Sequence, residues 1–250
     1  TNTGKDLSGW KFNIYKDINL TTLVEGSPFV TDDNGVIQVG LVPGYYWIQE
    51  VDESDRNPDW IYDTSVRRVS VTVNKVSSMT FTNTHLGYAE IQKTTNTGKN
   101  LGGWKFDIFQ DAACTQAVEG SPYTTNDAGK MSVCLRAGTY YVREVDESTS
   151  KPDWVFDSTV HEVTVMAGET ASVILENLQM GKIKLVKLMP DGGSLSGWVF
   201  DIYRKSDNAH IGTYTTDEKG TILSEWLIPG EYLVYEQPDE NGRYWCDSQN

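Results

Sequence analysis

Three residue types that could form a covalent cross-link recur in this chain at a spacing of 94 positions. Each type appears twice, and the pairs are Lys93 and Lys187, Glu50 and Glu144, and Asn83 and Asn177. A further glutamate, Glu236, stands two positions short of the same spacing. A neutral lysine amine is a nucleophile and a carboxamide is an electrophile, so a lysine and an asparagine could join with loss of ammonia. A protonated glutamate beside them could hydrogen-bond the amide oxygen and carry protons between the two groups.

The charged members of this set alternate in phase with apolar residues. Lys93 shares a strand face with Ile91, and Glu144 shares one with Val142. This pattern places both charged groups in the core, where an unpaired charge is costly. Burial favours a neutral amine and a protonated carboxyl group. These are the protonation states from which a lysine could attack a carboxamide.

The residues alone are consistent with two arrangements. In the first, Lys93 and Asn177 are joined by an isopeptide bond that Glu144 promotes, in a reaction that happens once and is not turned over. In the second, Lys93 and Glu144 form a buried ion pair, and Asn177 is a hydrogen-bonding neighbour. Buried pairs are commoner than self-formed cross-links, so residue chemistry by itself favours the second arrangement.

The spacing of 94 positions governs the rest of the chain as well. The phrases LSGWKFNIY, LGGWKFDIF and LSGWVFDIY carry Trp10, Trp104 and Trp198. A fixed long period indicates an array of one domain type. We expect a first repeat over residues 1–86 that lacks its first strand, a complete second repeat over 87–180, and a third repeat over 181–250 that lacks its C-terminal strands. The joints are too short to be flexible tethers, so the modules should form a stiff rod.

The outer repeats carry incomplete sets of the cross-linking residues. Projecting Lys93 back by one period falls just before the first residue of the chain, so the first repeat has no equivalent lysine. The third repeat stops before its closing strand. The resulting half-sites are Glu50 with Asn83 and Lys187 with Glu236. We expect neither outer repeat to close its own bond.

Strand signals dominate the chain. Short runs of Val, Ile, Thr, Tyr and Trp alternate with polar residues and are separated by Gly, Asn and Asp. The segments TDDNG (31–35), TNDAG (125–129) and TDEKG (216–220) are typical of tight turns. No stretch shows a helical period over three turns. We therefore expect an all-β chain of tandem antiparallel β-sandwich or barrel modules.

The composition argues against several function classes. The 35 acidic and 21 basic residues give a net charge of −14, which disfavours nucleic acid as a partner. No apolar run is long enough to span a membrane. The three histidines are isolated and no CxxC occurs, so we expect neither a metal site nor a cofactor. No Ser–His–Asp or Cys–His order recurs and no phosphate loop is present, so we expect no enzyme beyond single-turnover isopeptide formation.

Two of the three cysteines fall in the second repeat. Cys114 and Cys134 could form a disulfide there, and two buried thiols are the alternative. Neither cysteine recurs, because Leu20 and Gly40 occupy their places in the first repeat. The fold therefore does not require them.

The repeats resemble the Cna B-type domain, also called the SpaA or prealbumin-like pilin domain, of Gram-positive surface proteins. The motifs in the second repeat are IQK (91–93), TNDAG (125–129), LRAGTYYVRE (135–144) and ENL (176–178), and partial sets recur in the outer repeats. The resemblance covers essentially the whole chain and implies prealbumin-like, Ig-like modules. It also implies a Lys93–Asn177 isopeptide bond with Glu144 as the promoting acid, so it favours the first arrangement of the trio. The implied location is the extracellular, cell wall-anchored surface of a Gram-positive bacterium.

Two functions compete under this resemblance. The repeats could be a stalk whose partners are the neighbouring repeats of the same chain. Alternatively, they could themselves bind a host matrix protein, immunoglobulin or surface glycoprotein. Tyr45 and Trp47 point away from the core if Ile48 and Glu50 point inward, so they are a candidate ligand patch. Packing under a loop or against the next module is the alternative role for this pair.

Overall fold

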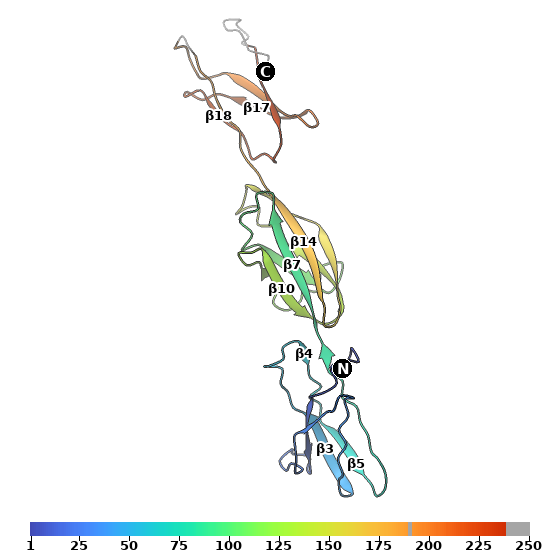
Figure 1. The fold of residues 1–250 in the computed structure, drawn as a ribbon. Helices are drawn as coiled ribbons and strands as arrows, with labels where there is room; N and C mark the ends of the chain where they lie inside the picture. Colours follow the sequence, from blue (N-terminus) through green and yellow to red (C-terminus); the bar gives the residue numbers. More distant parts are fainter. Residues whose placement is uncertain (190–191, 239–250) are drawn as a thin grey trace.

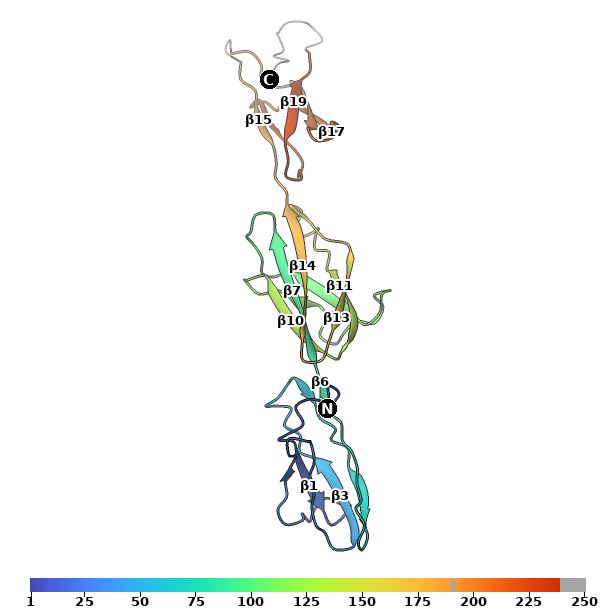
Figure 2. The same ribbon diagram turned by 45° about the vertical axis from the view of Figure 1, so that its right-hand side comes forward.

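A computed structural model describes residues 1–189 and 192–238 of the 250-residue chain. Within these ranges the chain forms strands and loops and contains no helix, which confirms the all-β prediction. The strands gather in three successive groups along an elongated molecule (Figures 1 and 2). Each group corresponds to one of the sequence repeats, which are called repeat one, repeat two and repeat three below.

Repeat two consists of two facing four-stranded sheets. The first sheet has the order β10-β7-β14-β12, with β7 (Gly87–Thr95), β10 (Lys130–Leu135), β12 (Trp154–Val155) and β14 (Thr170–Gln179). The second has the order β13-β11-β8-β9, with β8 (Lys105–Phe109), β9 (Tyr123–Thr124), β11 (Gly138–Glu144) and β13 (Val160–Val165). The two sheets enclose one core, as in a β-sandwich.

One strand pair differs from the expected antiparallel pattern. The first and last strands of repeat two, β7 and β14, are neighbours and run parallel, with Lys93 opposite Leu175 and Thr95 opposite Asn177. The chain enters this repeat at one end and leaves it at the other, so both strands run in the same direction (Figure 1). Parallel neighbours need a long connection, and the remaining strands of the repeat supply it.

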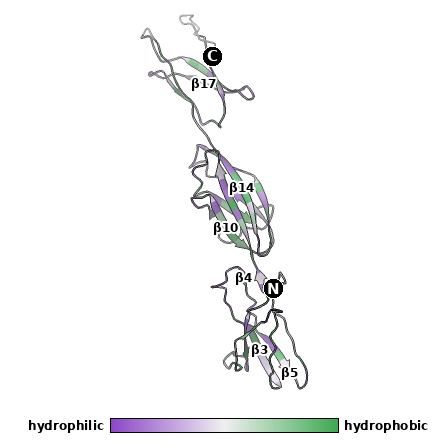
Figure 3. Ribbon diagram, viewed as in Figure 1, coloured by the Kyte–Doolittle hydropathy of each residue, from purple (hydrophilic) through white to green (hydrophobic). Residues whose placement is uncertain are grey.

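The core of repeat two lies between the two sheets. Ile91 from one sheet meets Phe106, Ile108 and Val142 from the other, and all four are fully buried. Hydrophobic and hydrophilic residues alternate along β14 in Figure 3, as expected for a strand with one face on a core. Burial of this apolar face is the main favourable contribution to the fold.

The outer repeats have fewer paired strands among the described residues. In repeat one, β1 (Lys11–Tyr15), β2 (Phe29–Val30), β3 (Gly44–Glu50) and β5 (Arg67–Val71) form a sheet of order β2-β1-β3-β5, and β4 (Trp60–Ile61) pairs with β6 (Thr84–His85). In repeat three, β17 (Ala209–Thr215), β16 (Val199–Arg204) and β19 (Tyr232–Glu236) form one sheet, and β15 (Lys184–Val186) pairs with β18 (Thr221–Leu223). The buried cluster of repeat one is correspondingly small and comprises Ile14, Val24 and Tyr46.

A buried threonine fixes the start of each tryptophan strand. The Thr125 hydroxyl accepts a hydrogen bond from the Trp104 N–H at 3.1 Å and donates to the Leu101 carbonyl at 2.8 Å. Thr31 and Thr216 make the equivalent bonds to Trp10 and Trp198. These threonines begin the TDDNG-type turns, whose first position is therefore occupied by a buried hydrogen-bonding residue. The turn motif and the tryptophan motif are therefore joined by the hydrogen bonds of this threonine.

The joint between repeats one and two is bonded on both sides. The His85 ring stacks on Trp60 of repeat one, with centroids 4.1 Å apart. The next residue, Leu86, accepts a hydrogen bond from the Gly168 N–H of repeat two at 2.7 Å. The Asn2 side chain bonds both backbone groups of His85, and Asn96 does the same for Gln179 at the other end of repeat two. The Asn2 and Asn96 contacts hold the last strand of their own repeat in place, and the Gly168–Leu86 bond connects the joint to repeat two.

The cysteines of repeat two do not form the disulfide. Cys114 and Cys134 are both free thiols and half-buried. Cys134 lies on β10, opposite Tyr88 in β7, whereas Cys114 sits in a turn after β8 with a φ of 55°. The structure therefore has the alternative arrangement of two unpaired thiols. Cys246 lies outside the described residues.

The two glycines at the joints have different surroundings, although they are repeat equivalents. A Cβ atom at Gly87 would lie 2.1 Å from the Met166 carbonyl oxygen and 2.7 Å from Val165, whereas one at Gly181 would meet nothing within 4 Å. We predict that Gly87→Ala destabilises repeat two by about 1–3 kcal/mol, as overpacking typically does. Gly181→Ala is the matched control and should leave the denaturant midpoint unchanged. Equal midpoints for the two variants would contradict the close packing at Gly87.

Candidate functional site

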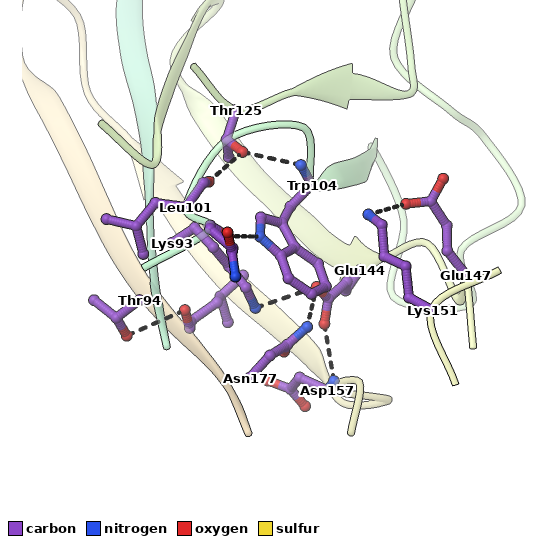
Figure 4. Close-up of polar contacts among 12 residues, drawn as sticks. Lys93, Thr94, Leu101, Trp104, Thr125, Glu144, Glu147, Lys151, Asp157 and Asn177 are labelled. Carbon is purple, nitrogen blue, oxygen red and sulfur yellow. Dashed lines mark hydrogen bonds and ion pairs between the residues drawn. The ribbon is translucent and has the colours of Figure 1, made fainter. Parts of the chain in front are cut away.

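The cross-linking residues of repeat two meet at one point in its core. Lys93 comes from β7 and Asn177 from the adjacent β14, while Glu144 ends β11 in the facing sheet. Lys93 and Asn177 are completely buried and Glu144 is 5% exposed. Figure 4 shows the three side chains converging from the two sheets. The structure thus brings together the three residues that the sequence singles out.

The Glu144 carboxylate bridges the two other members of the trio. Its Oε1 atom lies 3.1 Å from Lys93 Nζ and accepts a hydrogen bond from Asn177 Nδ2 at 2.7 Å. Its Oε2 atom accepts a hydrogen bond from the Asp157 backbone N–H at 2.9 Å. One carboxylate oxygen is therefore within reach of both nitrogen atoms of the proposed reaction.

Two polar atoms of the trio have no partner of good geometry among the described residues. Lys93 Nζ is within ion-pair distance of Glu144 but makes no hydrogen bond that satisfies angular criteria, and Asn177 Oδ1 accepts none. An unsatisfied buried polar atom is costly and therefore calls for an explanation. Lys93 Nζ still has the Glu144 carboxylate as an ion-pair partner, so the oxygen of the candidate electrophile is the atom of this pair without a partner among the described residues.

Burial sets the protonation tendency of the lysine. Loss of hydration lowers the pKa of Lys93 below its ordinary value of 10.5, and the nearby Glu144 carboxylate opposes this shift only in part. A lowered pKa increases the fraction of neutral amine at a given pH. The direction of the shift agrees with a nucleophilic role for Lys93.

Aromatic rings form the wall of the site. Lys93 Nζ lies 4.9 Å from the Trp104 ring centroid and 5.7 Å from that of Phe106. Lys151 Nζ lies 4.4 Å from the same Trp104 ring and pairs with Glu147 at 2.7 Å. Sequence reasoning missed Lys151 and Glu147, although the repeated phrases QEVDES and REVDES carry the glutamate position. It also missed Asp157, which the repeated phrases NPDWIYD and KPDWVFD contain.

The half-site of repeat one retains the acid and the amide. Asn83 Nδ2 donates to Glu50 Oε1 at 2.5 Å, as Asn177 does to Glu144. The Asp63 N–H, equivalent to that of Asp157, donates to Asn83 Oδ1 at 2.8 Å. The equivalent backbone N–H groups thus have different acceptors: the asparagine side-chain oxygen in repeat one and the glutamate carboxylate in repeat two. Burial raises the pKa of Glu50 to about 7, and its Oε2 atom is buried without a hydrogen bond in the described residues.

The half-site of repeat three retains the lysine and the acid. Lys187 Nζ lies 2.7 Å from Glu236 Oε1 and 2.8 Å from Oε2, and 4.1 Å from the Trp198 ring centroid. Glu236 pairs with Phe200 in the sheet, as Glu144 pairs with Phe106 in repeat two. Its shorter spacing in sequence therefore leaves its structural position unchanged.

The candidate ligand patch of repeat one is only partly exposed. Tyr45 is 57% exposed, with Arg68 4.9 Å from its ring centroid. Trp47 is half-buried and lies opposite Tyr15 and Arg68 on the neighbouring strands. The two residues share the outward face of β3, but only the tyrosine is open to solvent.

No helix in residues 1–189 and 192–238 is long and apolar enough to cross a bilayer. No group of three or more His, Cys, Asp or Glu side chains in the same ranges has the geometry of a metal site.

A comparison with protein families identifies the domain type. The family model of the SpaA prealbumin-like fold domain matches residues 1–85, 87–179 and 181–249. Among solved structures, the chain is similar to the Bacillus anthracis TIE protein (21% identity, 98% of this chain, 45% of that chain, TM-score 0.43). It is also similar to BcpA, the major pilin subunit of Bacillus cereus (14% identity, 97% of this chain, 89% of that chain, TM-score 0.46). The chain spans less than half the length of the Bacillus anthracis protein. No curated protein sequence matches it.

The raised pKa of Glu50 predicts a pH dependence for repeat one. Between about pH 4.5, the ordinary value, and about pH 7, the unfolded state releases the Glu50 proton while the folded state keeps it. The folded state then binds more protons, so the stability of repeat one should fall as pH rises through this window. A carboxyl ¹³C titration of Glu50 should have its midpoint near pH 7, and Glu50→Gln should remove this part of the pH dependence. A midpoint near the ordinary value would contradict the prediction.

Proposed function

The chain belongs to the SpaA family of prealbumin-like fold domains, and on this premise we propose that it is a stalk segment of a Gram-positive surface protein. In this proposal the chain is extracellular and belongs to a protein anchored to the cell wall. It consists of modules at 1–86, 87–180 and 181–250, and an isopeptide bond between Lys93 and Asn177 locks the second module. The observation that carries the proposal is the buried trio, in which Glu144 Oε1 lies within 3.1 Å of Lys93 Nζ and 2.7 Å of Asn177 Nδ2.

The geometry supports formation of the isopeptide bond with release of ammonia. The neutral Lys93 amine attacks the Asn177 side-chain carbonyl carbon, and a new C–N bond forms. Glu144 Oε1 takes the proton released by the amine and delivers it to the amide nitrogen, which it already contacts. The C–N bond of the carboxamide breaks and ammonia leaves. No electrons are exchanged with another molecule, so no cofactor is required.

A backbone donor could stabilise the intermediate. The Asn177 oxygen becomes negatively charged when the amine adds to the carbonyl, and a preorganised N–H group is an effective partner for such an oxygen. In repeat one the equivalent amide oxygen accepts the Asp63 N–H at 2.8 Å. In repeat two the Asp157 N–H instead contacts Glu144 Oε2. A shift of this donor toward Asn177 would give repeat two the arrangement seen in repeat one.

The strand arrangement suits a mechanical role. Tension along the chain enters repeat two at the start of β7 and leaves it at the end of β14, and these strands are parallel neighbours. A bond between Lys93 and Asn177 would carry this tension directly from one strand to the other. By analogy with disulfides, closing such a long loop stabilises the fold by about 4–5 kcal/mol.

A second candidate function is binding of a host protein by repeat one. Tyr45 is exposed, while the equivalent positions in the other repeats hold Thr139 and Glu231. A large aromatic side chain present on one repeat only favours a contact specific to that repeat. Tyr45→Ser would weaken such binding without changing the stability of repeat two.

The intact mass of the denatured protein tests the isopeptide bond. We predict a mass lower than that of the sequence by one ammonia, with the peptides containing Lys93 and Asn177 joined after digestion. Lys93→Ala and Glu144→Ala should each restore the full mass and lower the unfolding midpoint of repeat two, because the loop is then open.

The half-sites provide matched controls for this measurement. Glu50→Ala and Lys187→Ala change the equivalent residues of incomplete sets, so both variants should still lose one ammonia. A full mass for the wild-type chain would reduce the trio to a buried ion pair. A loss of more than one ammonia would mean that an outer repeat also closes, with a partner not identified above.

A further inference from the structure

Repeat one contains an aromatic pocket that the isopeptide chemistry does not use. Its volume is about 360 Å³, and its lining includes Trp10, Trp60, Tyr62, Glu53 and Asn57. The Trp10 and Trp60 rings meet edge to face with centroids 5.0 Å apart, and Tyr62 meets Trp10 in the same way at 5.2 Å. The three rings are half-buried, so their surfaces remain partly open to solvent.

Repeat two fills the equivalent space with a lysine of its own. Lys151 Nζ lies 4.4 Å from the Trp104 ring centroid and 2.7 Å from Glu147 Oε2. Figure 4 shows Lys151 directed at Glu147 beside this ring. Trp104 and Trp154, the equivalents of Trp10 and Trp60, are only 2% and 7% exposed, and Lys93 of β7, as well as Lys151, covers the Trp104 ring. Repeat two therefore demonstrates which group fits between these rings and this carboxylate.

Repeat one has Asn57 in place of that lysine. The Asn57 side chain is shorter and donates to the Tyr62 hydroxyl at 3.1 Å instead of reaching the carboxylate. Glu53 Oε1 pairs with Lys11 at 2.7 Å, as Glu147 Oε1 pairs with Lys105. The second oxygen, Oε2, receives no hydrogen bond from the described residues. The Trp10 ring and Glu53 Oε2 thus correspond to the two groups that Lys151 contacts in repeat two, with no lysine between them.

Two carboxylates, Glu53 and Asp6, line the pocket. In the described residues, Lys11 and Arg56 contact Glu53 only through its Oε1 atom, so the attraction for a further cation rests on the ring faces and on Glu53 Oε2. The Arg56 side chain lies 3.8 Å from Glu53 Oε1 and is 81% exposed. Aromatic faces attract cations, and the attraction is stronger where water is partly excluded. The net charge of −14 adds a long-range attraction for positively charged partners.

We propose that this pocket binds a primary alkylammonium group, the group that ends a lysine side chain. The ammonium would lie against Trp10 and donate a hydrogen bond to Glu53 Oε2, as Lys151 does to Glu147 in repeat two. A primary ammonium fits better than a quaternary one because the carboxylate needs a hydrogen-bond donor. This inference is independent of the proposed isopeptide bond, since the pocket lies in repeat one and contains none of Lys93, Glu144 and Asn177.

Binding can be measured on the full chain by following its tryptophan indole N–H signals by NMR. The probe is Nα-acetyl-lysine N-methylamide, and the norleucine analogue, which has the same backbone and an uncharged side chain, is the control. We expect the Trp10 and Trp60 signals to shift and saturate with the lysine probe, and the norleucine probe to bind at least tenfold more weakly. Equal responses to the two probes would overturn the proposal.

Two exchanges between the repeats give matched variants. Asn57→Lys should place a lysine in the pocket and abolish the response of Trp10 and Trp60 to the probe. Lys151→Asn should open the equivalent space in repeat two, so that Trp104 and Trp154 begin to respond. Retained binding in Asn57→Lys would overturn the proposal, and no response in Lys151→Asn would overturn the equivalence of the two spaces. Unchanged signals from the other repeats confirm that each variant is folded.

The source of the ammonium can be assigned in the same experiment. A short lysine-containing peptide and butylamine carry the same group, so both should shift the signals. Tighter binding of the peptide would support a polypeptide partner, and equal binding would support a free alkylamine as the ligand. Saturation of the Trp10 signal by neither compound would contradict the proposal.

Discussion

The architecture of repeat two depends on the burial of one lysine. Lys93 has no exposed surface, and its amine faces a carboxylate, a carboxamide and two aromatic rings. Such a group is tolerated in a core only if its charge is compensated or removed. Glu144 must therefore end its strand opposite β7, and β14 must bring Asn177 alongside. The Glu144 carboxylate, 3.1 Å from Lys93 Nζ, provides that compensation.

The three repeats have the same arrangement around the site but carry different members of the lysine, glutamate and asparagine set. Repeat one has the acid and the amide, repeat three has the lysine and the acid, and repeat two has all three. Where the lysine is absent, burial raises the pKa of the remaining glutamate, Glu50, to about 7. Where the lysine is present, as in repeat three, it pairs with both oxygens of Glu236. The glutamate position is thus retained in all three repeats, while its partner changes from an amide to a lysine.

The repeat boundaries and the positions of the cross-linking residues could be predicted from the sequence. The spacing of 94 positions gives the repeats, and the alternation of apolar residues gives the faces of the strands. Alternation places Lys93 and Glu144 on inward faces, where the structure has them, and the repeated spacing singles out Asn177 without giving its face. The parallel pairing of β7 with β14 could not be predicted in this way, since alternation gives the face of a strand but not the direction of its neighbour. The role of the Asp157 N–H could not be predicted either, because a backbone donor has no signature in the sequence. Cysteine spacing left a Cys114–Cys134 disulfide and two free thiols as alternatives, and the structure has the free thiols.

The parallel contact between the first and last strands also determines which parts of a module are free to change. The distance that one module adds to the array depends on β7, β14 and the short joints beside them. The segment from Asn96 to Glu169 lies between these two strands in the sequence and packs beside them. It does not lengthen the module along the direction of the array. Its exposed loops can therefore differ from repeat to repeat while every module keeps the same reach. An array of this kind can present several distinct surfaces at regular intervals, as the contrast between Asn57 and Lys151 already illustrates.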